Sequence, residues 1–149
     1  MPTIRIKSSR RISAPADRVY RCIADYRTHH PAFLPPAFSN FTVEEGGVGA
    51  GTVIHFTLTA GGRDPAPIPA VGRSASGRAL TETTIGTQNS TTFSVIPDGS
   101  GSNVTIRTEY EGSRGVSGMI ERFLAPLLLG RLYKDELQRL DTYTQTNPI

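Results

Sequence analysis

Hydrophobic positions in the first 26 residues change from an alternating to a helical pattern. Ile4 and Ile6 alternate with basic residues, which predicts a strand over residues 3–13 with one buried face. Residues 14–26 instead carry apolar side chains at the spacing i, i+3, i+4, i+7, which predicts a short amphipathic helix. The apolar stripe of this helix consists of Val19, Cys22, Ile23 and Tyr26.

Three prolines interrupt the next segment, at Pro31, Pro35 and Pro36. Because no long helix accommodates them, this segment is predicted to form a single helical turn and a fixed loop. The alternating pattern then returns and predicts six more strands, joined by turns rich in glycine. These strands cover residues 38–45, 52–59, 70–79, 80–87, 91–96 and 103–111. The irregular stretch 61–69 predicts a long hairpin tip or flap.

The hydrophobic period becomes helical again from residue 117 to about residue 144. The apolar stripe there is Val116, Ile120, Phe123, Leu127, Leu137 and Leu140, with Tyr133 beside it. The predicted order is strand, helix, short helix, six strands and one long helix. An apolar sheet face needs cover, and this last helix is the one long enough to supply it, so an α+β fold is expected.

The composition agrees with one sheet-rich domain. The 149 residues include 15 Gly, 11 Pro and 17 Thr, which favour turns and strands. The single cysteine, Cys22, excludes an intramolecular disulfide and a Cys-rich zinc module. No apolar run has the length of a signal peptide or a membrane span, so we expect a cytoplasmic protein without stable membrane insertion.

The basic residues allow two interpretations. The net charge is +3, and seven of the 16 basic residues lie within residues 5–27. They could form a surface for an anion or a nucleic acid. Alternatively, they are the solvated faces of one strand and one helix. No nucleic-acid-binding module is recognisable, so no nucleic-acid partner is predicted.

Five segments of the chain resemble the START/polyketide-cyclase superfamily (SRPBCC), the helix-grip proteins that include the birch-pollen allergens. These segments are APADRVYRCIADY at 14–26, GAGTVIHFTL at 49–58, SGRALTET at 76–83, TTFSVIPDGSGSNVTIRTEY at 91–110 and RLYKDELQRLDTY at 131–143. The resemblance spans nearly the whole chain. It implies a helix-grip fold, in which a seven-stranded curved antiparallel sheet surrounds a long C-terminal helix. It also implies an internal, mostly apolar cavity for a lipid, polyketide, steroid or similar molecule.

Three histidines are candidates for chemistry, and none lies in a metal-binding pattern. His29 and His30 are adjacent and point apart, and no HExxH motif accompanies them, so neither a metal nor a cofactor is expected. Either residue could act as a general base at a cavity, because an imidazole titrates near neutral pH. The alternative is a surface pair in a proline-rich loop. His55 is predicted to face outward, because its strand parity is opposite to that of Ile54 and Phe56.

Charged residues on the later strands fall into two groups. Arg107, Glu109 and Glu111 have outward parity, which predicts cross-strand pairs on the solvent face. Glu82 shares the parity of a neighbouring leucine and could point inward. A buried carboxylate needs a partner, and Arg73 is the expected one. Such an inward pair would serve catalysis or anchor a ligand.

Aromatic residues complete the predicted site. Tyr26, Tyr110 and Tyr133 lie on apolar stripes, either as core residues or with a hydroxyl directed into the cavity to hold a carbonyl or enolate. The candidates for catalysis are His30, Glu82 and Tyr110. The predicted ligand-binding residues are Tyr26, His30, Phe33, Phe56, Arg73, Glu82, Phe93, Thr108, Tyr110, Phe123, Leu127 and Tyr133.

Three functions are consistent with the sequence. The leading hypothesis is binding of a hydrophobic small molecule, such as a lipid, polyketide or quinone, by a carrier or sensor. The second is an enzyme similar to polyketide cyclases and dehydratases, with cavity Tyr, His or Glu as acid or base. The third is a protein-interaction module similar to the coenzyme-Q-binding or ribosome-associated members, acting through Arg10, Arg11 and Arg18. A monomer or homodimer is expected.

Overall fold

The computed structural model describes residues 3–59, 66–76, 78–111 and 115–147, with the backbone alone for residues 66, 74–76 and 115–126. Its elements are β1 (Thr3–Ile12), α1 (Ala16–Ala24), the 3₁₀ helix η1 (His30–Phe33), β2 (Phe38–Glu45), β3 (Val53–Leu58), β4 (Ala66–Ser76), β5 (Ala79–Thr84), β6 (Ser90–Asp98), β7 (Gly101–Glu111) and α2 (Gly115–Thr146). This order confirms the predicted strand–helix–short helix–six strands–helix arrangement. Among the described residues, no helix is long and apolar enough to cross a membrane.

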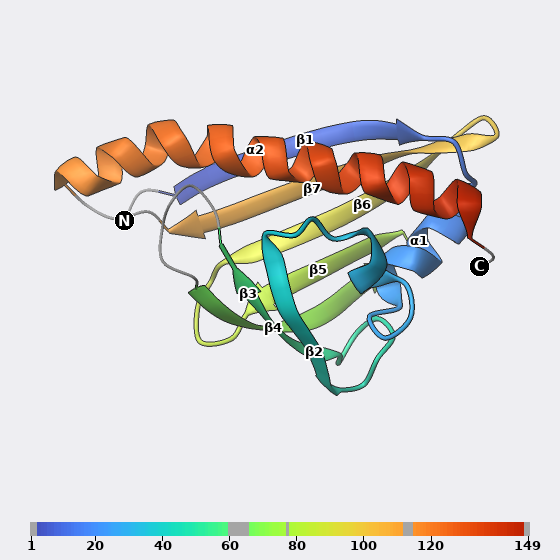
Figure 1. Ribbon diagram of the computed structural model, residues 1–149, viewed down its shortest axis with the longest axis horizontal. Coiled ribbons are helices and arrows are strands. Elements are labelled where there is room, and N and C mark those ends of the chain that lie inside the picture. Colours follow the sequence, from blue (N-terminus) through green and yellow to red (C-terminus); the bar gives the residue numbers. More distant parts are fainter. Residues whose placement is uncertain (1–2, 60–65, 77, 112–114, 148–149) are drawn as a thin grey trace.

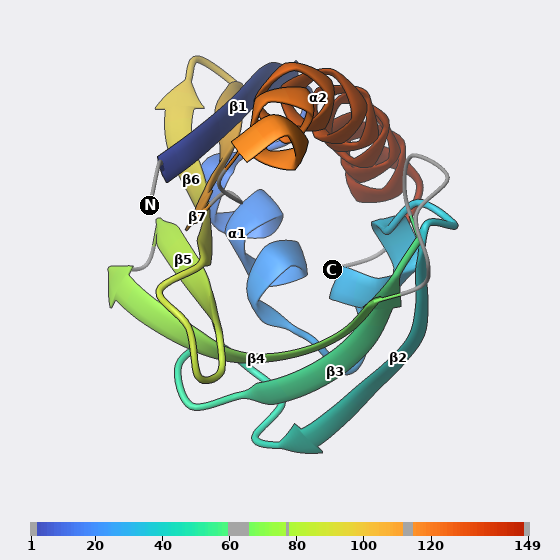
Figure 2. The same ribbon diagram turned by 90° about the vertical axis from the view of Figure 1, so that its left-hand side faces the viewer.

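The seven strands form one antiparallel sheet in the order β1-β7-β6-β5-β4-β3-β2. Strands β2 to β7 therefore follow the chain as hairpins, and β1 is added beside the last strand. The sheet curves strongly, and α2 lies over its inner side (Figures 1 and 2). This architecture is the α+β helix-grip fold that the sequence predicts.

The apolar stripe of α1 faces the core, as predicted. Val19, Cys22 and Ile23 are fully buried, and burial raises the pKa of the Cys22 thiol to about 11, as expected for an inert core cysteine. Asp25 follows the last residue of α1. Its carboxylate accepts hydrogen bonds from the backbone N–H groups of Arg27 and Thr28. This turn directs the chain from α1 into η1.

Strand β4 begins earlier than the sequence predicts. Residues 66–69 belong to it and pair with β3, although the sequence analysis placed them in an irregular segment with three prolines. Pro69 accepts a hydrogen bond from the Ile85 N–H through its carbonyl, on the side of β5. Because the N and C=O of a strand residue point to the same side, the missing N–H of Pro69 leaves the β3 ladder intact. Residues 61–65 of the predicted flap lie outside the described residues.

One face of α2 is buried over its C-terminal half. Its members recur every three or four residues and are Tyr133, Glu136, Leu137, Leu140 and Thr144. Tyr133, Leu137, Leu140 and Thr144 are typical of the buried face of an amphipathic helix that packs on a sheet. The fifth, Glu136, is a carboxyl group in the middle of an apolar stripe, and it belongs to the cavity described below.

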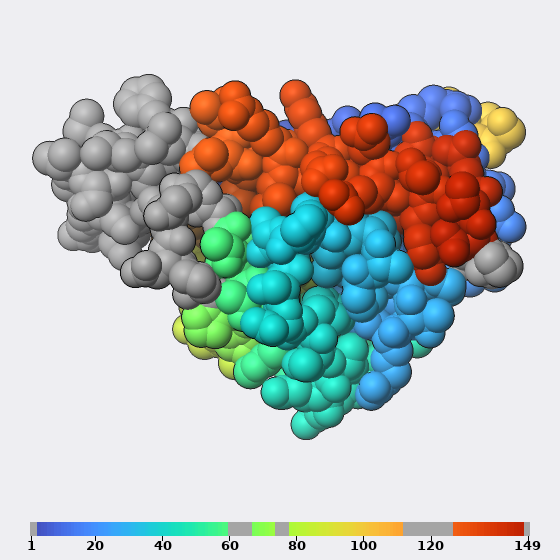
Figure 3. Space-filling model, viewed as in Figure 1, coloured from blue at the N-terminus to red at the C-terminus, as the bar shows by residue number. Residues whose placement is uncertain are grey.

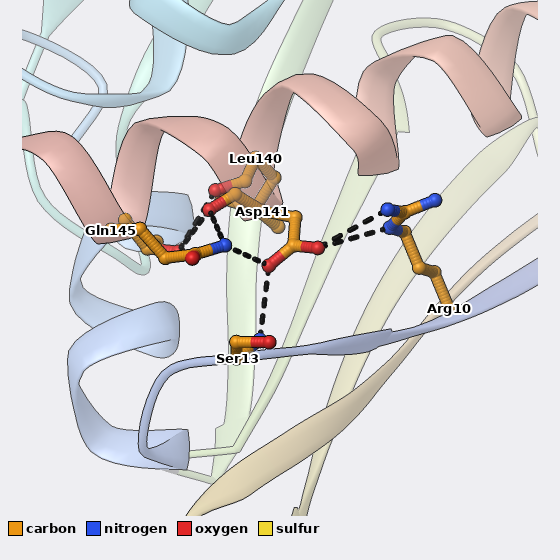
Figure 4. A network of polar contacts seen from close by, with 6 residues as sticks. Arg10, Ser13, Leu140, Asp141 and Gln145 are labelled. Carbon is orange, nitrogen blue, oxygen red and sulfur yellow. Dashed lines mark hydrogen bonds and ion pairs between the residues drawn. The ribbon is translucent and has the colours of Figure 1, made fainter.

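Asp141 joins the end of β1 to α2 (Figure 4). Its carboxylate accepts hydrogen bonds from the backbone N–H of Ser13 at 3.0 Å, from the Gln145 side chain at 2.7 Å and from Arg10 at 3.2 Å. The Asp141 side chain is only 13% exposed, whereas Arg10 is 43% exposed. The backbone contact therefore contributes more to stability than the partly solvated ion pair.

We predict that Asp141→Ala lowers the free energy of unfolding by about 1–3 kcal/mol, because a backbone N–H and an ion pair lose their acceptor. Urea unfolding measures the difference. The control is Asp135→Ala on the same helix, which breaks the exposed Asp135–Arg139 pair and should cost less than about 0.5 kcal/mol. Equal losses for the two variants would contradict a structural role for Asp141.

Candidate functional site

A cavity of about 320 Å³ lies between the inner face of the sheet and α2. Most of its wall is apolar. The aliphatic and aromatic lining residues are Leu34, Phe38, Phe41, Ile54, Phe56, Leu58, Ile68, Ala70, Phe93, Leu128 and Leu129. On the face drawn in Figure 3, the atoms of α2 lie directly against those of the η1 region. The wall of the cavity thus comes from segments far apart in the chain.

Alternation on β3 builds much of the apolar wall. Ile54, Phe56 and Leu58 share the inward face, as their parity predicts. The ring of Phe56 packs edge-on against Phe38, with 5.5 Å between the centroids, and stacks on Phe41 at 6.4 Å. His55 has the opposite orientation, is exposed and lies 3.5 Å from a carboxylate oxygen of Glu44, which confirms that it faces outward.

Glu82 on β5 points inward and meets two residues from the α1–η1 region. The Tyr26 hydroxyl donates a hydrogen bond to Glu82 Oε1 at 2.9 Å, and His30 Nε2 lies 3.7 Å from the same oxygen. His30 Nδ1 lies 2.6 Å from the carbonyl oxygen of Ile23. A carbonyl can only accept, so His30 carries its proton on Nδ1 and presents an unprotonated Nε2 to Glu82.

Burial displaces the pKa values of this cluster. Desolvation lowers the pKa of His30 to about 4, so its ring is neutral near pH 7. Desolvation also raises the pKa of Glu82 to about 7, while the hydrogen bond from Tyr26 acts in the opposite direction. The pKa of Tyr26 is raised by its own burial and by the carboxyl group of Glu82. Glu82 therefore changes charge near neutral pH, whereas His30 and Tyr26 stay neutral.

Gly72 makes room for the Tyr26–Glu82 contact. In the ladder between β4 and β5, Gly72 lies directly opposite Glu82. A Cβ atom on Gly72 would lie 3.0 Å from the Gly49 carbonyl oxygen and 3.4 Å from the ring of Tyr26. A side chain at this position would therefore displace the tyrosine or the turn beside it.

The predicted pairing of Glu82 with Arg73 is wrong. Arg73 is the neighbour of Gly72 in β4, lies opposite Thr81 and is exposed. Successive side chains in a strand point to opposite faces, so an inward Glu82 requires an outward Arg73. The partner of Glu82 is the hydroxyl of Tyr26, just after the C-terminal end of α1, and not the expected cation.

A second polar group lies on the side of the cavity formed by β6, β7 and α2. The hydroxyl groups of Thr91 and Thr108 are 2.8 Å apart, and Thr108 is also bonded to the Tyr133 hydroxyl. Burial raises the pKa of Tyr133 to about 12.

Three residues further along α2, Glu136 is 2% exposed, and its Oε2 has no hydrogen-bond partner among the described residues. Burial first and the charge of Glu82 second raise the pKa of Glu136 well above its usual range.

Comparison with known proteins agrees with this architecture. Residues 3–145 match the family described as polyketide cyclase / dehydrase and lipid transport. The chain belongs to this family. Among curated proteins, no sequence matches significantly. The KanY protein, whose solution structure was determined by NMR, is 31% identical, with a TM-score of 0.86 over 97% of this chain and 99% of that chain.

More distant structures share the fold alone. The aromatase/cyclase ZhuI from Streptomyces sp. R1128 is 14% identical, with a TM-score of 0.79 over 97% of this chain and 94% of that chain. Norcoclaurine synthase from Thalictrum flavum, solved with dopamine and hydroxybenzaldehyde, is 19% identical, with a TM-score of 0.73 over 99% and 90%. The helix-grip family thus places different chemistries on one framework.

Seven predicted site residues line the cavity of this family member. They are His30, Phe56, Glu82, Phe93, Thr108, Tyr110 and Tyr133. Tyr26 and Phe33 are buried behind the wall, where Tyr26 holds Glu82 and Phe33 packs 4.8 Å from the ring of His30. Which of these residues contact a ligand, and whether His30, Glu82 or Tyr110 acts in catalysis, stays a prediction.

The other candidates from the sequence analysis are not part of the described cavity wall. Leu127 is 50% exposed, and it lies outside the cavity wall because the helical period places Leu128 and Leu129 there instead. The side chain of Phe123 is outside the described part of the chain. His29 points away from His30, and its Nδ1 lies 2.7 Å from the Tyr143 hydroxyl. The described residues contain no group of three His, Cys, Asp or Glu side chains that could hold a metal ion.

Glu136 was missed by the sequence analysis. Its spacing of three residues from Tyr133 and four from Leu140 puts it on the same face as both, which is the signal that could have identified it. That a carboxyl group occupies an apolar stripe is uncommon, because burial of an unpaired charge is costly.

Glu82 makes folding depend on pH. Its pKa rises from 4.5 to about 7 on folding, so the folded protein holds a proton that the unfolded chain releases. The contribution of this proton to the free energy of unfolding is fully present below about pH 4.5 and is lost as the pH rises through about 7. Relative to Glu82→Gln, which cannot ionise, the wild type should lose about 2–3 kcal/mol of unfolding free energy between pH 5 and pH 8.

Urea unfolding of both proteins at the two pH values measures this difference. The exposed Glu45→Gln serves as the control and should follow the wild-type profile. A profile for Glu82→Gln that runs parallel to the wild type would contradict the raised pKa of Glu82.

Proposed function

We propose that this protein binds a small apolar molecule in the cavity between the sheet and α2, as a carrier or sensor. The observation that supports this proposal is the cavity of about 320 Å³ with its largely aromatic and aliphatic wall. Pockets that bind small molecules are typically concave and apolar, with a few polar groups that orient the guest. Glu82, Glu136 and the Tyr133–Thr108 pair supply such polar groups here.

The volume indicates the size of the guest. An engineered apolar cavity of about 150 Å³ accommodates benzene. The cavity of this protein is about twice as large, which corresponds to a guest of about two rings or a short branched chain. A neutral two-ring probe such as 2-(2-naphthyl)ethanol is therefore a suitable test ligand. The sequence contains no Trp, so the naphthyl fluorescence can be followed without an indole background.

We predict that Ala70→Leu weakens binding of 2-(2-naphthyl)ethanol by at least about tenfold, because three added carbon atoms occupy space that the guest needs. Ala70 is 3% exposed and lines the cavity. Fluorescence titration measures the affinity, and native mass spectrometry detects any co-purified molecule. The control is Ala50→Leu at an exposed turn position, which should bind the probe like the wild type. No binding to the wild type, or equal binding to Ala70→Leu with its fold intact, would contradict the proposal.

A second candidate function is acid–base catalysis of the polyketide cyclase or dehydratase type. Its support is that two ionisable carboxyl groups, Glu82 and Glu136, line one cavity together with the Tyr133 hydroxyl. A pKa of about 7 suits Glu82 to take a proton from a carbon atom next to a carbonyl group. The protonated Glu136 or the Tyr133 hydroxyl could donate a hydrogen bond to the enolate oxygen that forms.

Deuterium exchange of 2-tetralone tests this candidate without knowledge of the natural substrate. In D₂O, the protein should accelerate exchange of the protons next to the carbonyl, as followed by NMR. Because Glu82 acts in its ionised form, the rate should rise with pH and level off above about pH 7. Glu82→Gln should slow the exchange by about 100-fold, whereas Glu45→Gln should not change it. Exchange no faster than in buffer would exclude this chemistry for such ketones.

The third hypothesis, a basic surface for a protein partner, has no specific support from the described contacts. Arg10 and Arg11 are already paired with Asp141 and Asp98, at 3.2 and 3.1 Å. These pairs reduce the positive charge available to an acidic partner. The hypothesis therefore stays a prediction.

A further inference from the structure

In the described part of the cavity wall, the two carboxyl groups face no Arg or Lys side chain. Among the described lining residues, Glu82 and Glu136 are the acidic members, and no Arg or Lys accompanies them. The one imidazole, His30, is neutral because its burial lowers its pKa to about 4. Arg73, Arg131 and Lys134 are exposed. The described wall thus carries acidic groups without any matching positive charge.

Glu136 also lacks a hydrogen-bond partner within the described part of the chain. Its side chain is buried in the wall, yet Oε2 finds no donor among the described residues. The other acid, Glu82, accepts a hydrogen bond from Tyr26 and so is partly satisfied. A buried polar atom without a partner costs free energy, and a bound guest can remove that cost by supplying the missing donor.

We infer that the cavity selects a hydrophobic amine, whose ammonium group binds between Glu82 and Glu136 while its apolar body fills the aromatic part of the wall. This inference rests on the proposed function, since it names the chemical class of the guest. A protonated amine brings both a positive charge and N–H donors, and hydrogen bonds between charged groups are about twice as strong as neutral ones. The phenylalanine rings of the wall also favour a nearby cation through their negative faces.

The same arrangement disfavours an anionic guest. The carboxylate of a fatty acid or aryl acid would enter a wall that already holds two acidic groups and, in its described part, no Arg or Lys side chain. Two like charges in a poorly solvated site repel each other. A neutral alcohol should lie between the two extremes, because it can donate one hydrogen bond but brings no charge.

A matched set of three naphthyl compounds tests the inference at pH 7.5. The set consists of 2-(2-naphthyl)ethylamine, 2-(2-naphthyl)ethanol and 2-naphthylacetate, which share the apolar body and differ in charge. Fluorescence titration of the wild type should give an amine affinity about tenfold higher than that of the alcohol, and an acetate affinity at least about tenfold lower. Isothermal titration calorimetry gives the same ranking independently.

Two substitutions then locate the selectivity. Glu82→Gln removes a carboxylate, and Glu136→Gln removes a buried carboxyl group that gives up its proton when an ammonium group binds beside it. Both changes keep the shape almost constant, and each should lower the amine affinity by about tenfold while the alcohol affinity changes less than about threefold. Glu45→Gln removes a carboxylate at an exposed position outside the cavity wall and should leave all three affinities unchanged. Because the alcohol still reports an intact cavity, loss of amine binding cannot be confused with unfolding.

The outcomes separate the inference from the proposed function. If the alcohol binds and the amine binds no more tightly, the inference is overturned and ligand binding stands. The same holds if the acetate binds best, or if Glu136→Gln and Glu82→Gln keep the full preference for the amine. If none of the three compounds binds the wild type, both the inference and the proposed function are overturned.

Discussion

The structure depends on how one long helix covers the apolar face of a strongly curved sheet. Of the helices in the described residues, α1 and η1 are short, and α2 spans 32 residues. The helix packs along β1, and Asp141 fastens its C-terminal half to the end of that strand. The sheet bends away from this contact toward β2 (Figure 2). The space that remains between α2 and the curved sheet is the cavity, so the cavity results from how the helix packs on the sheet.

The polar groups inside the cavity follow from a second constraint, which is that buried polar atoms need partners. Tyr26 satisfies one oxygen of Glu82, and Thr91, Thr108 and Tyr133 satisfy one another. Glu136 differs, because its second carboxyl oxygen has no partner among the described residues. The same desolvation accounts for the displaced pKa values of His30, Glu82 and Glu136, so packing and acid–base properties have one origin.

Alternation along a strand proved the most informative signal for individual residues. It correctly indicated that Ile54, Phe56 and Leu58 face inward and His55 outward. It also allowed an inward Glu82, but the partner chosen for it, Arg73, was incompatible with the same rule once the register was known. Glu82 lies opposite Gly72, which forces Arg73 outward. A register between two strands depends on pairing that no single strand encodes.

The sequence by itself determined the order of the elements, the inward and outward faces of the strands and the stripe of the first helix, because these depend on residue spacing within a short segment. Only the tertiary structure decided which polar residues meet. Tyr26 and Glu82 are 56 positions apart, and Glu136 reaches the same cavity from the other end of the chain. Burial, and with it the pKa of each carboxyl group, is a property of the surrounding residues. It therefore appears only when distant segments have been packed together.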